Sequence, residues 1–457
     1  MLVIWSGKKL PIQVNSGRQE KRTQRIVVAR RTVHRCSPRL SVFIKWISEM
    51  LRIEPEEYRN RVESLQSAVR QAGLDLFIVS AFESIYYLTG AGFEPLERPF
   101  FLLVRPSGAP RLLVPKLDHE HMKKAHNISA ENIHTYSEYP APAGRSWSDR
   151  LPELIDDAQC IGVEPSLRQD IFSELSGHSL RMVPLVERLR LVKTQAEVKM
   201  IERAAMYADD GVKRLLAASC YGATVAEGFA ETRTVTSRII REVHDWEPLT
   251  TKVIMATWAA PGSAMPHSVP DLCDRLCEGP HVAMVLTRVN GYAAESERTY
   301  FTASPSTEVK QAFDAMTEAR RIAFELIRPG MACSELDGCV NEFLRKEGYG
   351  SEEQRLHRTG HGFGLGNHEA PWIAEGSEDR LAENMVISIE PGIYLAGIGG
   401  VRHSDTVLVT NDSFRLLTHC PMDLGSLVIR QWKPLTRAKG WLVRRALGLA
   451  LRARPKK

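Results

Sequence analysis

No run of apolar residues in this sequence is long enough to cross a membrane as a helix. The 457 residues are 43% hydrophobic and 25% charged, an ordinary balance for a globular protein. A spanning helix needs about twenty mostly apolar residues in succession, and none occurs. The sequence therefore predicts no membrane-spanning helix. Its length predicts two domains, or one large domain with additions.

Cysteine is scarce and scattered. The eight cysteines lie far apart, and no two have the Cys-x-x-Cys spacing. That spacing is typical of zinc knuckles and dithiol redox sites, so the sequence disfavours both. A disulfide-stapled secreted scaffold is disfavoured as well, because such scaffolds are short and rich in cysteine. We expect a reducing compartment and a cytoplasmic location.

Acidic residues are almost absent from the two ends of the chain. Residues 1–50 contain eleven Lys and Arg but only two Glu, and residues 428–457 contain ten Lys and Arg and no acid. The net charge of the whole chain is only +5, so the middle is acidic on balance. A nucleic-acid-binding enzyme usually carries its basic residues on the folded body. We therefore predict no nucleic-acid partner.

Each basic end has more than one interpretation. The N-terminal segment, residues 1–50, is Arg-rich like a transit peptide but lacks the apolar core of a secretory signal. We expect either a disordered extension, or a start codon assigned too far upstream, with the true start at Met50. The basic tail, residues 428–457, includes GWLVRRALGLALRARPKK, which fits a short amphipathic helix in weak contact with an anionic membrane surface or a partner. A solvated tail is the alternative.

Residues 55–185 alternate between helical and strand patterns. Apolar residues recur at helical spacing from Val62 to Ala72, and Gly73 fits the end of that helix. The apolar segments LDLFIVS, FFLLVR and RLLVP follow as predicted strands. This alternation predicts a smaller α/β domain. The stretch LVERLRLVKT, around 186–194, is interpreted as a connector.

Residues 195–415 form a second, larger predicted domain. The predicted elements are a helix from Gln195, strands at 281–289 and 291–302, and helices at about 307–327 and 334–346. The apolar face of the first helix consists of Val198, Ile201, Ala205, Ala208, Val212 and Leu215. Ser334 is the predicted N-cap of the last helix. Helices and antiparallel strands without regular βαβ crossovers predict an α+β catalytic domain.

Two further motifs carry histidine and glutamate. In TGHGFGLGNHEAP, His361 lies among glycines, where close backbone approach is available, and a turn would bring His368 to the same cleft. In VISIEPGIYL, Glu390 ends an apolar strand just before Pro-Gly. A carboxylate at the mouth of a sheet suits a ligand or a general base. Structural histidines and a strand-end acid facing water are the alternatives.

The segment NGYAAESERTYF places two acids on one face of a predicted strand. Glu295 and Glu297 are two residues apart, so their side chains point the same way. If they are buried, they raise each other's pKa, which suits proton transfer. The alternative is an exposed acidic face paired with Arg298. In MPHSVP, His267 lies in a stiff loop between prolines, where a proton shuttle or a substrate contact is expected.

The order of these motifs resembles the creatinase/prolidase/aminopeptidase P superfamily. RVESLQSAVRQAGLDLFIVSAFESIYYLTG is similar to its N-terminal domain, and TGHGFGLGNHEAP, ISIEPGIYL and GGVRHSDTVLVT are similar to three of its catalytic motifs. The resemblance covers about residues 55–415. It implies an α+β pita-bread catalytic domain preceded by a smaller α/β creatinase-type domain. It also implies a homodimer, with each N-terminal domain near the partner's active site.

The ligand pattern of the metal-dependent members is incomplete in this chain. Those members use two Asp, one His and two Glu. His361 and Glu390 match the third and fourth ligands, and Glu295 occupies the second position. Met284, whose thioether is a poor ligand for Mn, Co or Zn, stands at the first position, and Ser404 stands at the last. The resemblance thus disfavours a two-metal bridge, while one ion on Glu295, His361 and Glu390 stays open.

Creatinase, the metal-free branch, is matched in the same region. Glu297 stands at the Glu of its Ala-Leu-Glu-Arg-Thr motif, and His267 is similar to its catalytic histidine. His361 and Glu390 align with its Gly-His and Glu-Pro residues. The resemblance implies that His267 moves a proton from water to the leaving nitrogen, while Glu297 and Glu390 hold a cationic group by bidentate hydrogen bonds. His403 stands where creatinase has Glu, so we expect a substrate other than creatine.

Three functions follow as hypotheses. The first is a metal-independent hydrolase that cleaves a C–N bond of a small amidino, amide or dipeptide-like substrate and needs no cofactor. Its predicted catalytic residues are His267, Glu297, His361, His368 and Glu390, and its predicted substrate contacts are Glu295, Arg402 and His403. The second is a Xaa-Pro dipeptidase or aminopeptidase with one Mn, Co or Zn ion. The third is a non-catalytic binding protein, which the retained cluster of acids and histidines argues against. A lyase, which this fold also hosts, is a further alternative.

Overall fold

The computed structural model describes residues 52–94, 96–429 and 433–449. The segment 1–50 lies outside the described residues, so the predictions made for it are not tested by the structure. The described residues belong to one compact unit. None of its helices is long and apolar enough to cross a bilayer. The cysteines within the described residues are free thiols.

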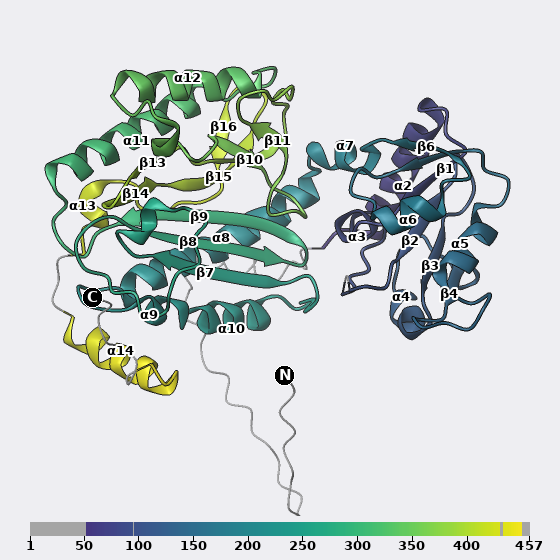
Figure 1. Ribbon diagram of the computed structural model, residues 1–457, viewed down its shortest axis with the longest axis horizontal. Coiled ribbons are helices and arrows are strands. Elements are labelled where there is room, and N and C mark those ends of the chain that lie inside the picture. Colours follow the sequence, from purple (N-terminus) through teal and green to yellow (C-terminus); the bar gives the residue numbers. More distant parts are fainter. Residues whose placement is uncertain (1–51, 95, 430–432, 450–457) are drawn as a thin grey trace, which may run out of the picture. The chain divides into compact units, whose positions relative to one another are not determined.

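The first part of the described chain forms a six-stranded mixed sheet (Figure 1). The strands lie in the order β4-β3-β2-β1-β5-β6, with β1 antiparallel to β2 and parallel to β5. Their bounds are β1 Leu76–Val79, β2 Phe101–Val104, β3 Arg111–Pro115, β4 Ile133–Tyr136, β5 Cys160–Val163 and β6 Ser179–Met182. The helices are α2 Pro55–Gln71, α3 Phe82–Thr89, α4 His119–Met122, α5 Trp147–Ile155, α6 Gln169–Glu174 and α7 Leu185–Leu191. The three predicted strands are β1, β2 and β3, so the α/β character of this region is confirmed.

The remainder of the chain is organised by an eight-stranded antiparallel sheet. Its strands lie in the order β11-β10-β12-β15-β9-β8-β7, with β16 paired to β15, and β13 and β14 form a separate hairpin. Their bounds are β7 Lys252–Trp258, β8 His281–Val289, β9 Tyr292–Tyr300, β10 Gly360–Gly362, β11 Glu369–Ile373, β12 Val386–Ile389, β13 Gly392–Leu395, β14 Gly399–Arg402, β15 Ser404–Val409 and β16 Phe414–Leu416. The helices are α8 Gln195–Ala218, α9 Val225–Phe229, α10 Thr232–Glu242, α11 Thr307–Leu326, α12 Cys333–Lys346, α13 Leu424–Leu427 and α14 Pro434–Ala446. Long helices with antiparallel strands confirm the α+β class.

The long helix α8 begins at Gln195, as predicted. Thr194 caps it, because its hydroxyl accepts from the backbone N–H of Glu197 while the Glu197 carboxylate accepts from the Thr194 N–H. The predicted apolar face is buried throughout, at Val198, Ile201, Ala205, Ala208, Val212 and Leu215. The reciprocal cap therefore determines where the helix begins, and the apolar face determines which side of the helix packs against the sheet.

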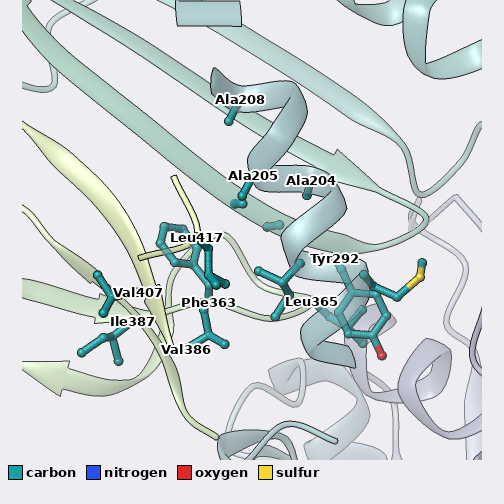
Figure 2. Packing of buried hydrophobic residues seen from close by; sticks show 14 of the residues in the cluster. Ala204, Ala205, Ala208, Tyr292, Phe363, Leu365, Val386, Ile387, Val407 and Leu417 are labelled. Carbon is teal, nitrogen blue, oxygen red and sulfur yellow. The ribbon is translucent and has the colours of Figure 1, made fainter. Parts of the chain in front are cut away.

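Small side chains let α8 approach the sheet closely. Figure 2 shows Ala204, Ala205 and Ala208 of α8 in the packed core. At Gly211 an added Cβ would lie 2.6 Å from Cγ1 of Val285 on β8, closer than any real Cβ contact. Glycine at this position is thus required by the helix–sheet distance rather than by backbone conformation. This packing supports β8 and β9 from one side.

The stretch interpreted as a connector contains the helix α7, and Arg190 and Lys193 of that stretch are buried. One local prediction is wrong. Ser334 lies inside α12, and Ala332 is the N-cap residue there, without a side-chain cap. The backbone N–H of Cys333 instead donates to the carbonyl of Asp379. Tertiary contacts thus replaced the side-chain cap that the local sequence offered.

A buried charge cluster joins the strands β9 and β15 to the helix α11. Asp405 accepts from Nη2 of Arg298 at 2.7 Å and is also paired with Arg320 of α11. All three side chains are at most 2% exposed. Thr418 donates to the same carboxylate at 2.7 Å. One carboxylate therefore serves two buried guanidinium groups and ties α11 to the centre of the sheet.

We expect Asp405→Asn to be severely destabilising. The amide leaves two buried guanidinium groups without a counter-charge, which costs about 3–5 kcal/mol. Urea denaturation of the purified protein measures the loss in free energy of unfolding. Glu318→Gln, which breaks an exposed ion pair with Arg321 on the same helix, is the control and should change stability little. Equal losses in the two variants would contradict the assignment.

Candidate functional site

The candidate site lies on neighbouring strands in the middle of the eight-stranded sheet. Strands β10, β12, β15 and β9 are adjacent in that order. β9 supplies Glu295 and Glu297, β10 supplies His361, and Glu390 directly follows β12. The N–H of Glu390 donates to the carbonyl of Thr359 at 2.8 Å, which holds the end of β12 beside β10. The sheet order therefore brings together motifs that are far apart in the sequence.

Three carboxylates converge at this point. Oxygen atoms of Glu295, Glu297 and Glu390 all lie within 4.8 Å of one another, and each residue is at most 5% exposed. Burial raises the pKa of Glu295 well above its usual value, and the like charges of Glu297 and Glu390 add to the effect. The acidic face of β9 is buried, so the alternative of an exposed face paired with Arg298 is wrong. Glu390 likewise does not face water.

A guanidinium group is built into the acidic cluster. Arg402, the last residue of β14, donates from Nε to Oε2 of Glu297 at 2.5 Å and from Nη2 to Oε1 at 2.8 Å. Its Nη1 also donates to the hydroxyl of Tyr394 at 3.1 Å. Two-point pairing of this kind is among the stronger polar interactions in proteins. Burial raises the pKa of Glu297, and Arg402 offsets part of that rise.

This pairing changes the roles expected for both residues. Each carboxylate oxygen of Glu297 already accepts a hydrogen bond from Arg402. The pocket therefore contains its own guanidinium where the creatinase resemblance implied a cationic substrate group. Arg402, predicted as a substrate contact, is fully engaged with Glu297 and Tyr394. We no longer assign substrate binding to either residue.

Two histidines contact Glu390. Its Oε1 lies 3.1 Å from Nε2 of His361 and 3.7 Å from Nδ1 of His357. Ser388 also donates to this oxygen, at 3.2 Å. Burial alone would raise the pKa of Glu390, but His357 and then His361 lower it below its usual range. Glu390 therefore stays ionised at neutral pH.

His357 is a site residue that the sequence interpretation missed. Burial lowers its pKa to about 4 in spite of the nearby Glu390, so its imidazole is neutral at pH 7. The only signal in the sequence was its position four residues before His361. That spacing alone does not show whether the side chain turns toward the strand ends or away from them.

The other predicted histidines lie at the edge of the cluster. The ring centroids of His361 and His368 are 4.3 Å apart, so the glycine-rich turn does bring these two together. His267 is exposed, and its ring lies 5.8 Å from that of His357. Within the described residues no direct contact joins His267 to a carboxylate of the cluster. It therefore lies at the rim, with His357 between it and Glu390.

His403 points away from the site. It lies between Arg402 and Ser404, so strand alternation directs it to the opposite face. There its ring packs 5.2 Å from that of Phe313, and Nδ1 lies 3.4 Å from Nη1 of Arg320. Burial, then the charges of Arg298 and Arg320, lower its pKa well below the usual value. We therefore withdraw His403 as a substrate contact.

The donor set fits one divalent ion. Nε2 of His361 is buried and has no hydrogen-bond partner of suitable geometry among the described residues. It lies 3.1 Å from Glu390, whose carboxylate converges with those of Glu295 and Glu297. A nitrogen beside several carboxylate oxygens is a donor set that Mn, Co and Zn accept. Met284 and Ser404 lie directly opposite Glu297, one on each neighbouring strand. Neither of these two side chains supplies a carboxylate.

Comparison with protein families matches both parts of the chain. Residues 200–411 match metallopeptidase family M24, and residues 61–192 match the creatinase/prolidase N-terminal domain. These ranges contain the α+β and the α/β regions described above. They agree with the resemblance drawn from the sequence motifs.

The alignments with curated relatives span nearly the whole length of those relatives. A probable dipeptidase, PepE, from Mycobacterium tuberculosis is 30% identical over 393 residues, which cover 82% of this chain and 97% of that protein. A Xaa-Pro dipeptidase from Lactobacillus helveticus is 31% identical over 387 residues, covering 81% and 99%.

Solved structures show the same architecture. The dipeptidase PepE from Mycobacterium ulcerans superposes with a TM-score of 0.71 at 27% identity, covering 83% of this chain and all of that one. The prolidase from Pyrococcus horikoshii gives a TM-score of 0.68 at 27% identity, covering 80% and 99%. The chain therefore belongs to metallopeptidase family M24 in the creatinase/prolidase/aminopeptidase P superfamily, and it is a peptidase-like hydrolase of C–N bonds.

Proposed function

We propose that this protein is a Xaa-Pro dipeptidase that works with a single divalent ion. The charge of the buried cluster carries the proposal. Three carboxylates and one guanidinium leave an excess of two negative charges when all are ionised. Burying such an excess without compensation is costly. One divalent cation balances it, whereas two would leave the pocket positive.

The relatives support the peptidase over the metal-free amidinohydrolase. Dipeptidases and a Xaa-Pro dipeptidase are among the proteins to which the chain is similar, and the matched family is one of metallopeptidases. The first hypothesis also required Glu297 to bind a cationic substrate group, and Arg402 occupies that position. We therefore favour the second hypothesis for substrate and for cofactor, with Mn, Co or Zn as the ion.

The roles follow from the geometry. Glu295, Glu390 and His361 would hold the ion, which supplies Lewis-acid polarisation of the scissile carbonyl when bound. Arg402 pairs with Glu297 through two hydrogen bonds and supplies the remaining positive charge. His357, neutral at pH 7, positions the Glu390 carboxylate. His368, exposed beside His361, is placed to hydrogen-bond to substrate at the open side.

Several further assignments accompany this proposal. We place the domain boundary between residues 185 and 195, with the N-terminal domain over 55–185 and the catalytic domain over 195–415. The homodimer, the cytoplasmic location and the lack of a nucleic-acid partner stay predictions.

We expect cleavage of Xaa-Pro dipeptides that depends on an added divalent ion. Dialysis against a chelator should abolish activity, and Mn or Co should restore it. His361→Ala removes a ligand and should lower kcat/KM by at least about a hundredfold, since even residues that only support ligands often cost 10–100-fold. His244→Ala, an exposed histidine far from these contacts, is the matched control. Undiminished activity in chelator would restore the metal-free mechanism. Failure to cleave any Xaa-Pro dipeptide in the presence of Mn or Co would contradict the peptidase assignment.

Ion binding should also raise thermal stability independently of turnover. A ligand that binds only the folded state stabilises it, by about 2.7 kcal/mol at a hundredfold excess over Kd. Differential scanning fluorimetry with and without Mn measures the shift in Tm. Glu295→Gln should remove most of that shift, because it removes a charged ligand. A full Mn-dependent shift in Glu295→Gln would show that the ion binds elsewhere.

Replacing Glu297 and replacing Glu295 should have different effects on the free energy of unfolding of chelator-treated protein. Glu297→Gln leaves the buried guanidinium of Arg402 unpaired and should cost about 3–5 kcal/mol in free energy of unfolding. Glu295→Gln removes a carboxylate that is repelled by two others, so it should leave the metal-free protein equally or more stable. Denaturation in urea with chelator present compares the two variants. Similar losses would mean that Arg402 compensates both carboxylates equally.

A further inference from the structure

The C-terminal helix α14, Pro434–Ala446, is attached to the catalytic domain by charged contacts (Figure 1, yellow). Arg444 is paired with Glu227 of α9, and Lys439 is paired with Glu231 just beyond α9. Gly440 is the buried residue of the helix, and an added Cβ there would lie 2.8 Å from Oε1 of Glu227. The face of α14 toward the protein is therefore small and polar.

The opposite face of α14 is apolar and exposed. Leu435, Trp441 and Leu442 are 85%, 48% and 59% exposed. At 100° per residue, Leu435, Ala438 and Leu442 form one stripe along the helix, and Trp441 borders it. A helix on the surface of a globular protein ordinarily buries such a stripe and exposes its polar face. This helix does the reverse, and no part of the chain that the structure describes covers the stripe.

A basic residue borders the apolar stripe. Arg445 is exposed, and its guanidinium lies 5.3 Å from the ring centroid of Trp441. Residues 428–457 contain ten Lys and Arg and no acid. Lys439 and Arg444 are compensated by the acids on and next to α9. The surface around Trp441 and Leu442 therefore combines apolar side chains with uncompensated positive charge.

We propose that α14 is an interfacial helix that binds this protein to the surface of an anionic lipid bilayer. Helices that lie in a bilayer interface combine an apolar face carrying Trp and Leu with Lys and Arg at its borders. Such a helix keeps its polar face away from the acyl chains, and on α14 that face is the one fixed to the protein. Anionic headgroups complement the basic border. Pairing of two α14 faces from two copies is disfavoured, because it would bring like charges together.

Vesicle flotation with the full chain tests this proposal without reference to catalysis. The vesicles are phosphatidylcholine alone, or phosphatidylcholine in which about a third of the lipid is phosphatidylserine. The wild-type protein should float with the anionic vesicles and not with the neutral ones, and high salt should release it. The double variant Trp441→Ser/Leu442→Ser should bind at least about tenfold more weakly. Leu117→Ser, which removes an apolar side chain that is 66% exposed elsewhere on the surface, is the matched control and should bind normally.

A second readout separates insertion from electrostatic adsorption. The difference in fluorescence between wild type and Trp441→Phe isolates Trp441, and its emission should shift to the blue when anionic vesicles are added. Lack of flotation by the wild type would overturn the proposal, as would normal flotation by the double variant. Binding without a change at Trp441 would also overturn it, because charge alone would then hold the protein. Capture of an acidic protein in place of lipid would assign the face to a different partner.

Discussion

A buried excess of negative charge is the constraint on which this structure depends. Glu295, Glu297 and Glu390 meet on the central strands of the large sheet, where water is excluded. Arg402 compensates one of them through two hydrogen bonds, and His361 and His357 contact Glu390. The remaining charge explains why one divalent ion is the expected complement. A folded chain would gain little from this arrangement if no ligand were bound there.

The same strands carry a second charge cluster on their other face. Along β9, Glu297 points to the site and Arg298 points away, and along β15 Ser404 and Asp405 alternate in the same way. A slip of one residue in the pairing of β9 with β15 would bring Arg298 into the acidic pocket and a carboxylate into the structural cluster. The two clusters therefore specify the register of the sheet. The catalytic face and the stability of the fold are coupled through alternate residues.

Much of this arrangement was predictable from the sequence. The spacing of Glu295 and Glu297 indicated a shared face, and the motifs around His361 and Glu390 indicated a common site and the fold. The pairing of Glu297 with Arg402 was not predictable. Arg298 is the guanidinium next to Glu297 in the sequence, and Arg402 comes close to Glu297 only because strands distant in the sequence lie together in the fold. His403 was misplaced for a similar reason, since its motif gives its position but not the face on which it lies. Ser334 fits a cap locally, yet the backbone contact of Cys333 with Asp379 determined where α12 begins.

The outward apolar stripe of α14 shows the same limit at the surface. The sequence predicted an amphipathic helix, but only the ion pairs with Glu227 and Glu231 show which side faces the protein. Because these ion pairs fix the orientation of α14, its apolar stripe is identified as the surface proposed to bind lipid.

The number of divalent ions bound per folded chain is the most direct test of the account. Native mass spectrometry of protein reconstituted with Mn measures it without reference to any substrate. One ion per chain is the result that the charge of the cluster predicts. No ion would mean that protonation of Glu295 alone compensates the pocket, and two ions would mean that Met284 and Ser404 do not limit the site; either result would contradict the account.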